Sequence, residues 1–335
     1  MPQCLPKDDP NRVWPFCPSV VPSALFAVLF GILTVAHFVQ AIVHRKMYCW
    51  VIVVASLWQT ATYALREYSV YNQKNVGVYS LWFVMILVGP LWINAFVYMV
   101  VARLVWCFMP NKRLGGVRAW RFGTIFVLLD ILAFLVQVAG ASMASGNNLT
   151  YDQIMRGLHI YMGGVGLQQF FILAFTGLLI RFQLRYKREN PHPTSAAPMR
   201  LLYVLYAVLT LITVRIIFRL VEYSSGYESG IPTHEAYTFV LESLPMFVAV
   251  LLLNLVHPGR VMPGKENNIP SKKVRKQMVE EGLLPGRRGK GSRKSLRGSS
   301  SDTELAWSQT RPMPSASHHV PESGVVDSYE SYRHA

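Results

Sequence analysis

Long apolar runs alternate with short polar segments along most of this 335-residue chain. A bilayer core of about 30 Å needs about 20 apolar residues in a helix that rises about 1.5 Å per residue. Seven runs are long enough, at approximately residues 20–42, 48–66, 78–105, 122–143, 158–180, 201–222 and 236–256. Charged or turn-forming residues separate them, as in Pro110-Asn111-Lys112. The pattern predicts an all-α, polytopic membrane protein with seven transmembrane helices.

The distribution of Lys and Arg between alternate loops predicts the orientation, because cytoplasmic loops collect basic residues. One set of loops holds twelve: Arg45, Lys46, Arg103, Lys112, Arg113, Arg118, Arg121, Arg181, Arg185, Lys187, Arg188 and Arg200. The other set, with the N-terminal segment, holds five: Lys7, Arg12, Arg66, Lys74 and Arg156. We therefore expect the N-terminus outside and the C-terminus in the cytoplasm. The sequon Asn148-Leu149-Thr150 falls in a loop on the predicted outer side, which makes Asn148 a candidate glycosylation site.

Three regions follow from this pattern. Residues 1–19 form an extracellular segment, residues 20–258 a seven-helix domain, and residues 259–335 a tail rich in Lys, Arg, Ser, Pro and Gly. Because such a composition buries little apolar surface, we expect the tail to be disordered. Its basic block at residues 287–297 is suited to anionic lipids, and nearby serines could weaken that attraction if phosphorylated. The simpler alternative is a solvated tail that only fixes topology.

Composition excludes several other classes. The chain is 52% hydrophobic and 15% charged, which is too apolar for one soluble core. Its net charge of +15 does not indicate nucleic-acid binding, because the basic residues flank apolar runs or lie after Pro258. The first residues lack the pattern of a cleaved signal peptide.

The four cysteines form no CxxC pair and have no His at metal-ligand spacing, so we expect no metal site and no cofactor. Cys4 and Cys17 both precede the first apolar run and would face an oxidising exterior. They either form a local disulfide or remain two unpaired thiols.

Familiar membrane-protein motifs are incomplete. Residues 259–265 match most of a phosphate-binding loop, but Glu266 stands where that motif needs a hydroxyl. The last apolar run has no Lys for a retinal Schiff base. The Asp-Arg-Tyr and Asn-Pro-x-x-Tyr elements of G-protein-coupled receptors are missing at the third and seventh runs.

Polar side chains interrupt the apolar runs at every depth of the bilayer. Ionisable groups in hydrocarbon cost roughly 2.5–3.5 kcal/mol each on insertion scales, so those present are expected to face the bundle interior. Counted from the helix ends, they are His37, Gln40, Asn94 and Asp130 in the cytoplasmic half, Gln59, Gln137 and Gln168 near the middle, and Arg66, Arg215, Arg219, Glu222 and Glu242 in the outer half. We predict one interior chain of polar groups that reaches both leaflets. The alternative for each residue is a structural interhelical hydrogen bond worth about 0.6–2 kcal/mol.

Spacing groups some of these residues. Arg215, Arg219 and Glu222 share one helix face, which allows Arg219 to pair with Glu222. Asp130 and Gln137 share a face in the same way. Gly89-Pro90 lies in the middle of the third run, where proline removes a backbone hydrogen bond and either kinks the helix or only packs.

Several of these residues stand in longer motifs. The third run reads Gly89-Pro90-Leu-Trp-Ile-Asn-Ala95-Phe-Val-Tyr98 and is followed by Arg103; the fourth has Phe126, Asp130, Phe134, Gln137 and Gly140; the fifth has Gly157, Gly166 and Gln168. Further along come Arg215-Ile-Ile-Phe218-Arg219-Leu-Val-Glu222-Tyr-Ser-Ser-Gly226, His234-Glu235-Ala-Tyr237 and His257-Pro258-Gly259. In order and spacing these elements resemble the fungal RTA-like family, also called the lipid-translocating exporter family. The resemblance covers roughly residues 18–260.

Two positions depart from the family pattern. The second run has Gln59 and Thr62 before Tyr63 and Arg66 where the family usually carries an E-x-x-G-Y-x-x-R element, and Glu242 replaces an expected Asp. Loss of the first carboxylate leaves open how ion coupling or cation binding would work there.

The resemblance implies a plasma-membrane protein that moves amphipathic lipids, such as sphingoid long-chain bases, between leaflets or confers resistance to them. The candidate substrate-path residues are Tyr63, Arg66, Asn94, Asp130, Gln137, Gln168, Arg215, Arg219, Glu222 and Glu242. The acidic residues Asp130, Glu222 and Glu242 could attract an amine headgroup or accept protons. Arg215 or Arg219 could bind a phosphate.

Two alternatives remain. One is a seven-helix sensor or regulator that acts through its tail, and the other is an exporter of a small hydrophobic metabolite. No nucleophile or acid–base pair emerges, so we expect no enzymatic activity. The sequence names no protein partner.

Overall fold

A computed structural model describes residues 6, 13–14, 16–145, 150–191, 195–224, 234–264, 267–281 and 284. They belong to one compact unit that spans Met1–Leu284. The basic block predicted at 287–297 lies outside the described residues.

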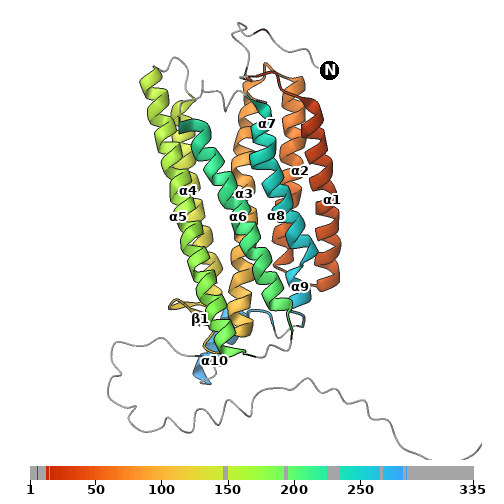
Figure 1. The fold of residues 1–335 in the computed structure, drawn as a ribbon, viewed down its shortest axis with the longest axis vertical. Coiled ribbons are helices and arrows are strands. Elements are labelled where there is room, and N and C mark those ends of the chain that lie inside the picture. Colours follow the sequence, from red (N-terminus) through yellow and green to blue (C-terminus); the bar gives the residue numbers. More distant parts are fainter. Residues whose placement is uncertain are drawn as a thin grey trace, which may run out of the picture. The chain divides into compact units, whose positions relative to one another are not determined.

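Long helices make up this unit (Figure 1). They are α1 (Val20–His44), α2 (Cys49–Tyr71), α3 (Val76–Phe108), α4 (Ala119–Ala144), α5 (Tyr151–Glu189) and α6 (Ala197–Ser224). A last rod consists of α7 (Glu235–Thr238), the π-helix η1 (Phe239–Ser243) and α8 (Leu244–Leu255), which follow one another directly. The predicted all-α class is therefore confirmed for the described residues, apart from one short hairpin.

Six of the described segments are long and apolar enough to cross a membrane, namely α1, α3, α4, α5, α6 and the rod that begins at Glu235. The segment α2 is not among them, because even its most apolar stretch is not apolar enough. Its polar residues Gln59, Thr62 and Arg66 are buried inside the bundle. The finding supports a multi-pass membrane protein with six such helices.

Helices α1 to α6 are longer than the apolar runs that predicted them. The fifth run, predicted at 158–180, is the 39-residue helix α5. It begins with a capping box in which Thr150 and Gln153 satisfy each other's backbone groups, and it continues through Lys187 and Arg188. Hydropathy marks only the part of a helix that meets lipid, whereas the helix ends at its caps.

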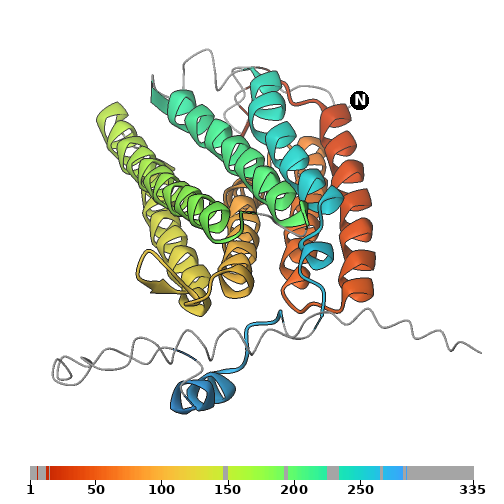
Figure 2. The ribbon, with the colours of Figure 1, turned by 60° about the horizontal axis from the view of Figure 1, so that its bottom comes forward.

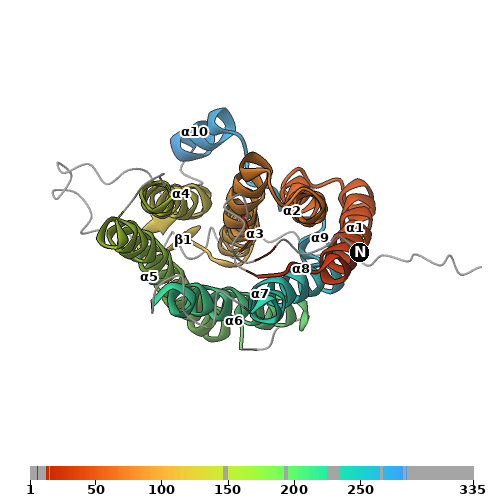
Figure 3. The same cartoon turned by 90° about the horizontal axis from the view of Figure 1, so that it is seen from above.

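The helices are arranged as a ring in which chain neighbours pack side by side and α8 closes against α1 (Figures 2 and 3). The helix α3 touches α2, α4, α5 and α6, and its most apolar stretch is the most buried among the described spans. Most of the core is one cluster around Phe96, Val97 and Val101 of α3.

A two-stranded hairpin joins α3 to α4. Strand β1 (Arg113–Leu114) pairs antiparallel with β2 (Val117–Arg118), with Leu114 opposite Val117. Gly115 and Gly116 have φ of 58° and 81°, which is the conformation that a tight two-residue hairpin turn requires.

The chain remains structured beyond the predicted boundary at Pro258. Helix α9 (Pro258–Val261) and helix α10 (Lys272–Glu280) follow it, and Met262 and Leu284 are buried in the core cluster. The Arg275 guanidinium lies 5.1 Å from the ring of Trp120, which ties α10 to α4. A disordered tail from Gly259 is thus wrong for the described residues up to Leu284, because composition alone does not reveal these few anchoring contacts.

Candidate functional site

All ten candidate residues are buried, which confirms that they face the interior of the bundle. The structure does not join them into one chain, however. They form separate clusters at different helix interfaces.

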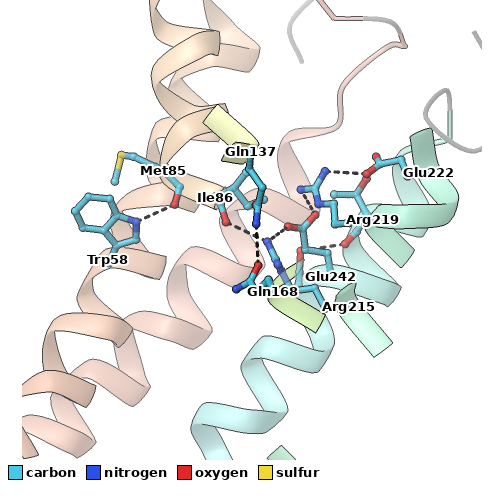
Figure 4. A network of polar contacts seen from close by, with 11 residues as sticks. Trp58, Met85, Ile86, Gln137, Gln168, Arg215, Arg219, Glu222 and Glu242 are labelled. Atoms are coloured by element: carbon cyan, nitrogen blue, oxygen red, sulfur yellow. Dashed lines mark hydrogen bonds and ion pairs between the residues drawn. The ribbon is translucent and has the colours of Figure 1, made fainter. Parts of the chain in front are cut away.

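The charged cluster consists of Arg215, Arg219, Glu222 and Glu242 (Figure 4). Arg215 Nη2 lies 2.8 Å from Glu242 Oε1, and Arg219 Nη1 lies 2.8 Å from Glu222 Oε2. Arg219 also pairs through Nη2 with the second oxygen of Glu242. The predicted Arg219–Glu222 pair is confirmed, and the central position of Glu242 between two guanidinium groups was not foreseen.

Two prolines shape the backbone around the charged cluster. Pro90 has no N–H and so leaves the carbonyl of Ile86 without its intrahelical donor. Arg215 Nη2 donates to that oxygen at 3.3 Å (Figure 4). Pro245, the second residue of α8, likewise cannot donate to the preceding turn, which accounts for the wider π turn that carries Glu242.

The Arg66 box is a second cluster, at the end of the bundle where α1 begins. The Arg66 guanidinium lies 4.7 Å from the ring of Trp14, 4.8 Å from that of Trp82 and 4.9 Å from that of Phe239. Its Nη2 pairs with Glu235 Oε1 at 2.5 Å. Such aromatic faces attract a cation, which compensates the burial of Arg66.

Glu235 also holds the N-terminal segment. Both of its carboxylate oxygens accept from the backbone N–H of Ser19, at 3.1 and 2.9 Å. Trp14 is buried against Tyr79 and Trp82. The partners of Arg66 lie far away in the sequence, so spacing could not reveal them; the His234-Glu235-Ala-Tyr237 element was the only signal for Glu235.

The Asp130 triad lies between α3 and α4. Asp130 Oδ2 accepts from Asn94 Nδ2 and from the Tyr98 hydroxyl, each at 2.9 Å. All three side chains are almost fully buried. Tyr98 is part of the RTA-like motif of the third run, but the sequence did not indicate that it bonds Asp130.

Gln137 and Gln168 bond directly across α4 and α5, with Nε2 of Gln137 donating to Oε1 of Gln168 at 3.0 Å (Figure 4). Glycines allow this close approach: a Cβ at Gly164 would lie 2.8 Å from the Gln137 backbone nitrogen. Small residues let membrane helices pack at short distance. This pair fits a structural role.

Tyr63 on α2 stacks on Phe26 and Phe30 of α1, with its ring centroid 5.4 and 5.6 Å from theirs.

At the opposite end of α1, Gln40 and Asn254 exchange two hydrogen bonds. The side-chain amide of Gln40 donates to the backbone oxygen of Asn254 at 3.0 Å, and the side-chain amide of Asn254 donates to the side-chain oxygen of Gln40 at 3.1 Å. His37 Nε2 lies 3.2 Å from the carbonyl oxygen of Val250. These contacts tie α1 to α8.

An apolar groove lies beside the charged cluster. It has a volume of about 430 Å³ and is lined by Val214, Ile217, Phe218, Val221, Tyr237 and Leu241. Ligand pockets in proteins commonly enclose about 300–1,000 Å³. The same turns of α6 and η1 thus carry charged residues on one face and the groove on the neighbouring face.

Some predictions fall on other parts of the chain. Asn148 and Cys4 lie outside the described residues. Cys17 is disulfide-bonded, and Cys49 is a buried free thiol. Within the described residues, no group of three or more His, Cys, Asp or Glu side chains is arranged to hold a metal ion.

The bundle and its buried polar clusters define a multi-pass helical membrane protein. A family model described as RTA1 like protein matches residues 52–265. The chain therefore belongs to the RTA1-like family, as its motifs indicated.

Curated relatives support the same family assignment. A probable lipid transporter of Emericella nidulans is 43% identical over 257 residues, which are 73% of this chain and 67% of the relative. A sphingoid long-chain base transporter of Saccharomyces cerevisiae is 23% identical over 279 residues, 72% of each chain. Protein RTM1 of the same yeast is 30% identical over 196 residues, 57% of this chain and 60% of the relative. No solved structure matches the chain.

Proposed function

We propose that this protein moves amphipathic lipids between the leaflets of a membrane, with a sphingoid long-chain base or a similar amine-bearing lipid as the substrate. The observation that carries the proposal is the pairing of the charged cluster with the apolar groove on neighbouring faces of α6 and η1. An amphipathic lipid has the same two parts, a polar head and an apolar chain. The names of two relatives, a probable lipid transporter and a sphingoid long-chain base transporter, support the same class.

The topology belongs to this proposal. Helix α2 crosses the membrane as a seventh span, since its 23 residues reach about 34 Å and its polar residues are buried while Val54 and Leu57 are exposed. The N-terminus is outside and the C-terminus cytoplasmic, as the loop charges indicate. We place the protein in the plasma membrane, with Asn148 as a glycosylation site and anionic lipids as partners of the basic block at 287–297.

Reconstitution tests the function directly. Purified protein in liposomes should accelerate the transbilayer movement of a fluorescent sphingoid base over protein-free vesicles. A panel with a phospholipid and a neutral lipid defines the headgroup. Equal rates with and without protein for every lipid would contradict the proposal.

The regulator alternative is favoured by one observation, the division of the chain at Leu284 into a compact unit and a basic remainder. A truncation after Leu284 separates the two functions. A transporter should keep its transbilayer activity in liposomes, whereas a regulator should lose its effect on lipid tolerance in cells. Export of a small hydrophobic metabolite, the third candidate, would appear in the same liposomes as flux of a lipid-free probe. We expect no catalytic turnover in any of these assays.

A further inference from the structure

Asp130 differs from the other buried acidic residues of the described helices. Glu222 and Glu242 both pair with arginine. Asp130 is 2% exposed and forms no ion pair with any described residue. It lies eleven residues after Ala119 and fourteen before Ala144, so it is roughly 16 and 21 Å from the two ends of α4. A carboxylate at that depth is far from the aqueous phase on either side, and no described residue serves as its counterion.

Among the described residues, no charged side chain forms a hydrogen bond or an ion pair with Asp130. Tyr98 on α3 is the one titratable group bonded to it among the described residues, and Asn94 is its other partner. Phe175 on α5 and Phe126 on α4 close the space around Tyr98, with ring centroids 4.5 and 5.4 Å away. Arg118 of β2 directly precedes α4 and so lies about 18 Å from Asp130 along the helix axis.

Two oxygen atoms in the triad lack donors. Asp130 Oδ1 and Asn94 Oδ1 are both buried and have no hydrogen-bond partner among the described residues, although Asn94 Nδ2 already donates to the other oxygen of Asp130. A buried polar atom without a partner is unusual in a folded protein. An added proton on Asp130 Oδ1 turns that oxygen into a donor, and the Asn94 oxygen is the free acceptor of the same pair of side chains. A proton on Oδ1 therefore removes the uncompensated charge, and a hydrogen bond from it to the Asn94 oxygen would satisfy both atoms.

We propose that Asp130 is a proton-binding site in the middle of the membrane and that exchange of this proton is coupled to lipid movement. The proton enters from water on one side of the membrane, occupies Asp130 Oδ1, and leaves to water on the other side as the bundle changes conformation. The coupling part rests on the proposed lipid transport. The proton site itself does not.

Infrared spectroscopy of the purified full-length protein tests the site without any transport. At pH 7 exposed carboxyl groups, with a pKa of about 4, are ionised. We expect the carbonyl band of a protonated carboxylic acid in the wild type and its loss in Asp130→Asn. The matched control Asp152→Asn removes an exposed carboxylate on α5 and should leave the band unchanged.

Two further variants keep the test decisive if Asp130→Asn does not fold. Asn94→Leu and Tyr98→Phe each remove one hydrogen bond to the carboxyl group, so both should shift the band to higher frequency. Absence of the band in the wild type, its persistence in a folded Asp130→Asn protein, or an unshifted band in both other variants would overturn the proposal. Loss of the wild-type band on addition of sodium would also overturn it, because the occupant would then be a metal cation.

The liposome assay distinguishes the two proposals. An Asp130 band in a protein that moves no lipid leaves the proton site intact and contradicts the transport function. Lipid movement by a protein without the band leaves the transport function intact and contradicts the proton site. Where both are present, an imposed pH gradient should change the wild-type lipid flux and should not change that of Asp130→Asn; an equal response of the two proteins would overturn the coupling.

Discussion

Arg215 donates a hydrogen bond to the backbone oxygen of Ile86, the atom that Pro90 leaves without an intrahelical donor. The side chain of α6 thereby replaces a missing backbone bond of α3. The same Nη2 also reaches Glu242 on η1, so one guanidinium joins three transmembrane segments. The carbonyl that Pro90 of the third run leaves without a donor is thus bonded by a charged side chain of the sixth run.

This relationship predicts that the effects of Arg215 and Pro90 on stability depend on each other. Arg215→Ala leaves the Ile86 carbonyl unsatisfied, which costs about 1–3 kcal/mol in addition to the broken ion pair. In a Pro90→Ala background the restored N–H satisfies that carbonyl. We expect Arg215→Ala to lower the apparent melting temperature in detergent by less in the Pro90→Ala background than in the wild type.

Gln40→Ala provides the control for that cycle, because Gln40 bonds Asn254 at the other end of the bundle. Its effect should add to that of Pro90→Ala, as expected for distant sites. Equal effects of Arg215→Ala in both backgrounds would contradict the role assigned to Ile86.

The two glutamates of the charged cluster should differ in their importance for stability. Glu242→Gln removes the carboxylate that faces two arginines, whereas Glu222→Gln removes one that faces Arg219 alone. Breaking a buried pair costs about 3–5 kcal/mol because the remaining charge is uncompensated. We expect Glu242→Gln to lower the melting temperature clearly more than Glu222→Gln, and the reverse order would show that Glu242 is not the centre of the cluster.

Packing of α4 on α5 should tolerate no side chain at Gly140. A Cβ there would collide with the backbone of Tyr161, whereas a Cβ at Gly166 meets nothing within 4 Å. Gly140→Ala should destabilise the protein by about 1–3 kcal/mol, as overpacking does. Gly166→Ala should be neutral or stabilising by up to about 1 kcal/mol, because alanine favours the helix. Thermal unfolding of both variants tests this, and equal melting temperatures would contradict the close approach.

The N-terminal segment should detach when Glu235 loses its charge. Glu235→Gln weakens both the pair with Arg66 and the contacts with the Ser19 N–H. We expect faster proteolysis before Val20 than in the wild type or in Glu67→Gln, which changes a neighbouring carboxylate on α2. Unchanged proteolysis in Glu235→Gln would mean that Trp14 alone holds the segment.

Sequence reasoning found what depends on local spacing. Hydropathy located the helices, and the spacing of Arg219 and Glu222 predicted their pair. It could not find Glu242 between two arginines, since that depends on how α6 meets η1 and on a π turn before Pro245. It predicted one polar chain where the structure has separate clusters, because depth along a helix does not reveal which neighbour each side chain faces.

If lipids move along the face formed by α6 and η1, a matched pair of tryptophan variants on that face should differ in transport. Leu241 lines the apolar groove, whereas Val240 is 55% exposed and is not part of its lining. The measurement is the rate of transbilayer movement of a fluorescent sphingoid base in liposomes with equal amounts of folded protein. We predict that Leu241→Trp fills the groove and slows this movement at least tenfold, while Val240→Trp matches the wild type. A wild-type rate for Leu241→Trp, or an equal loss of rate in both variants, would contradict this path for the lipid.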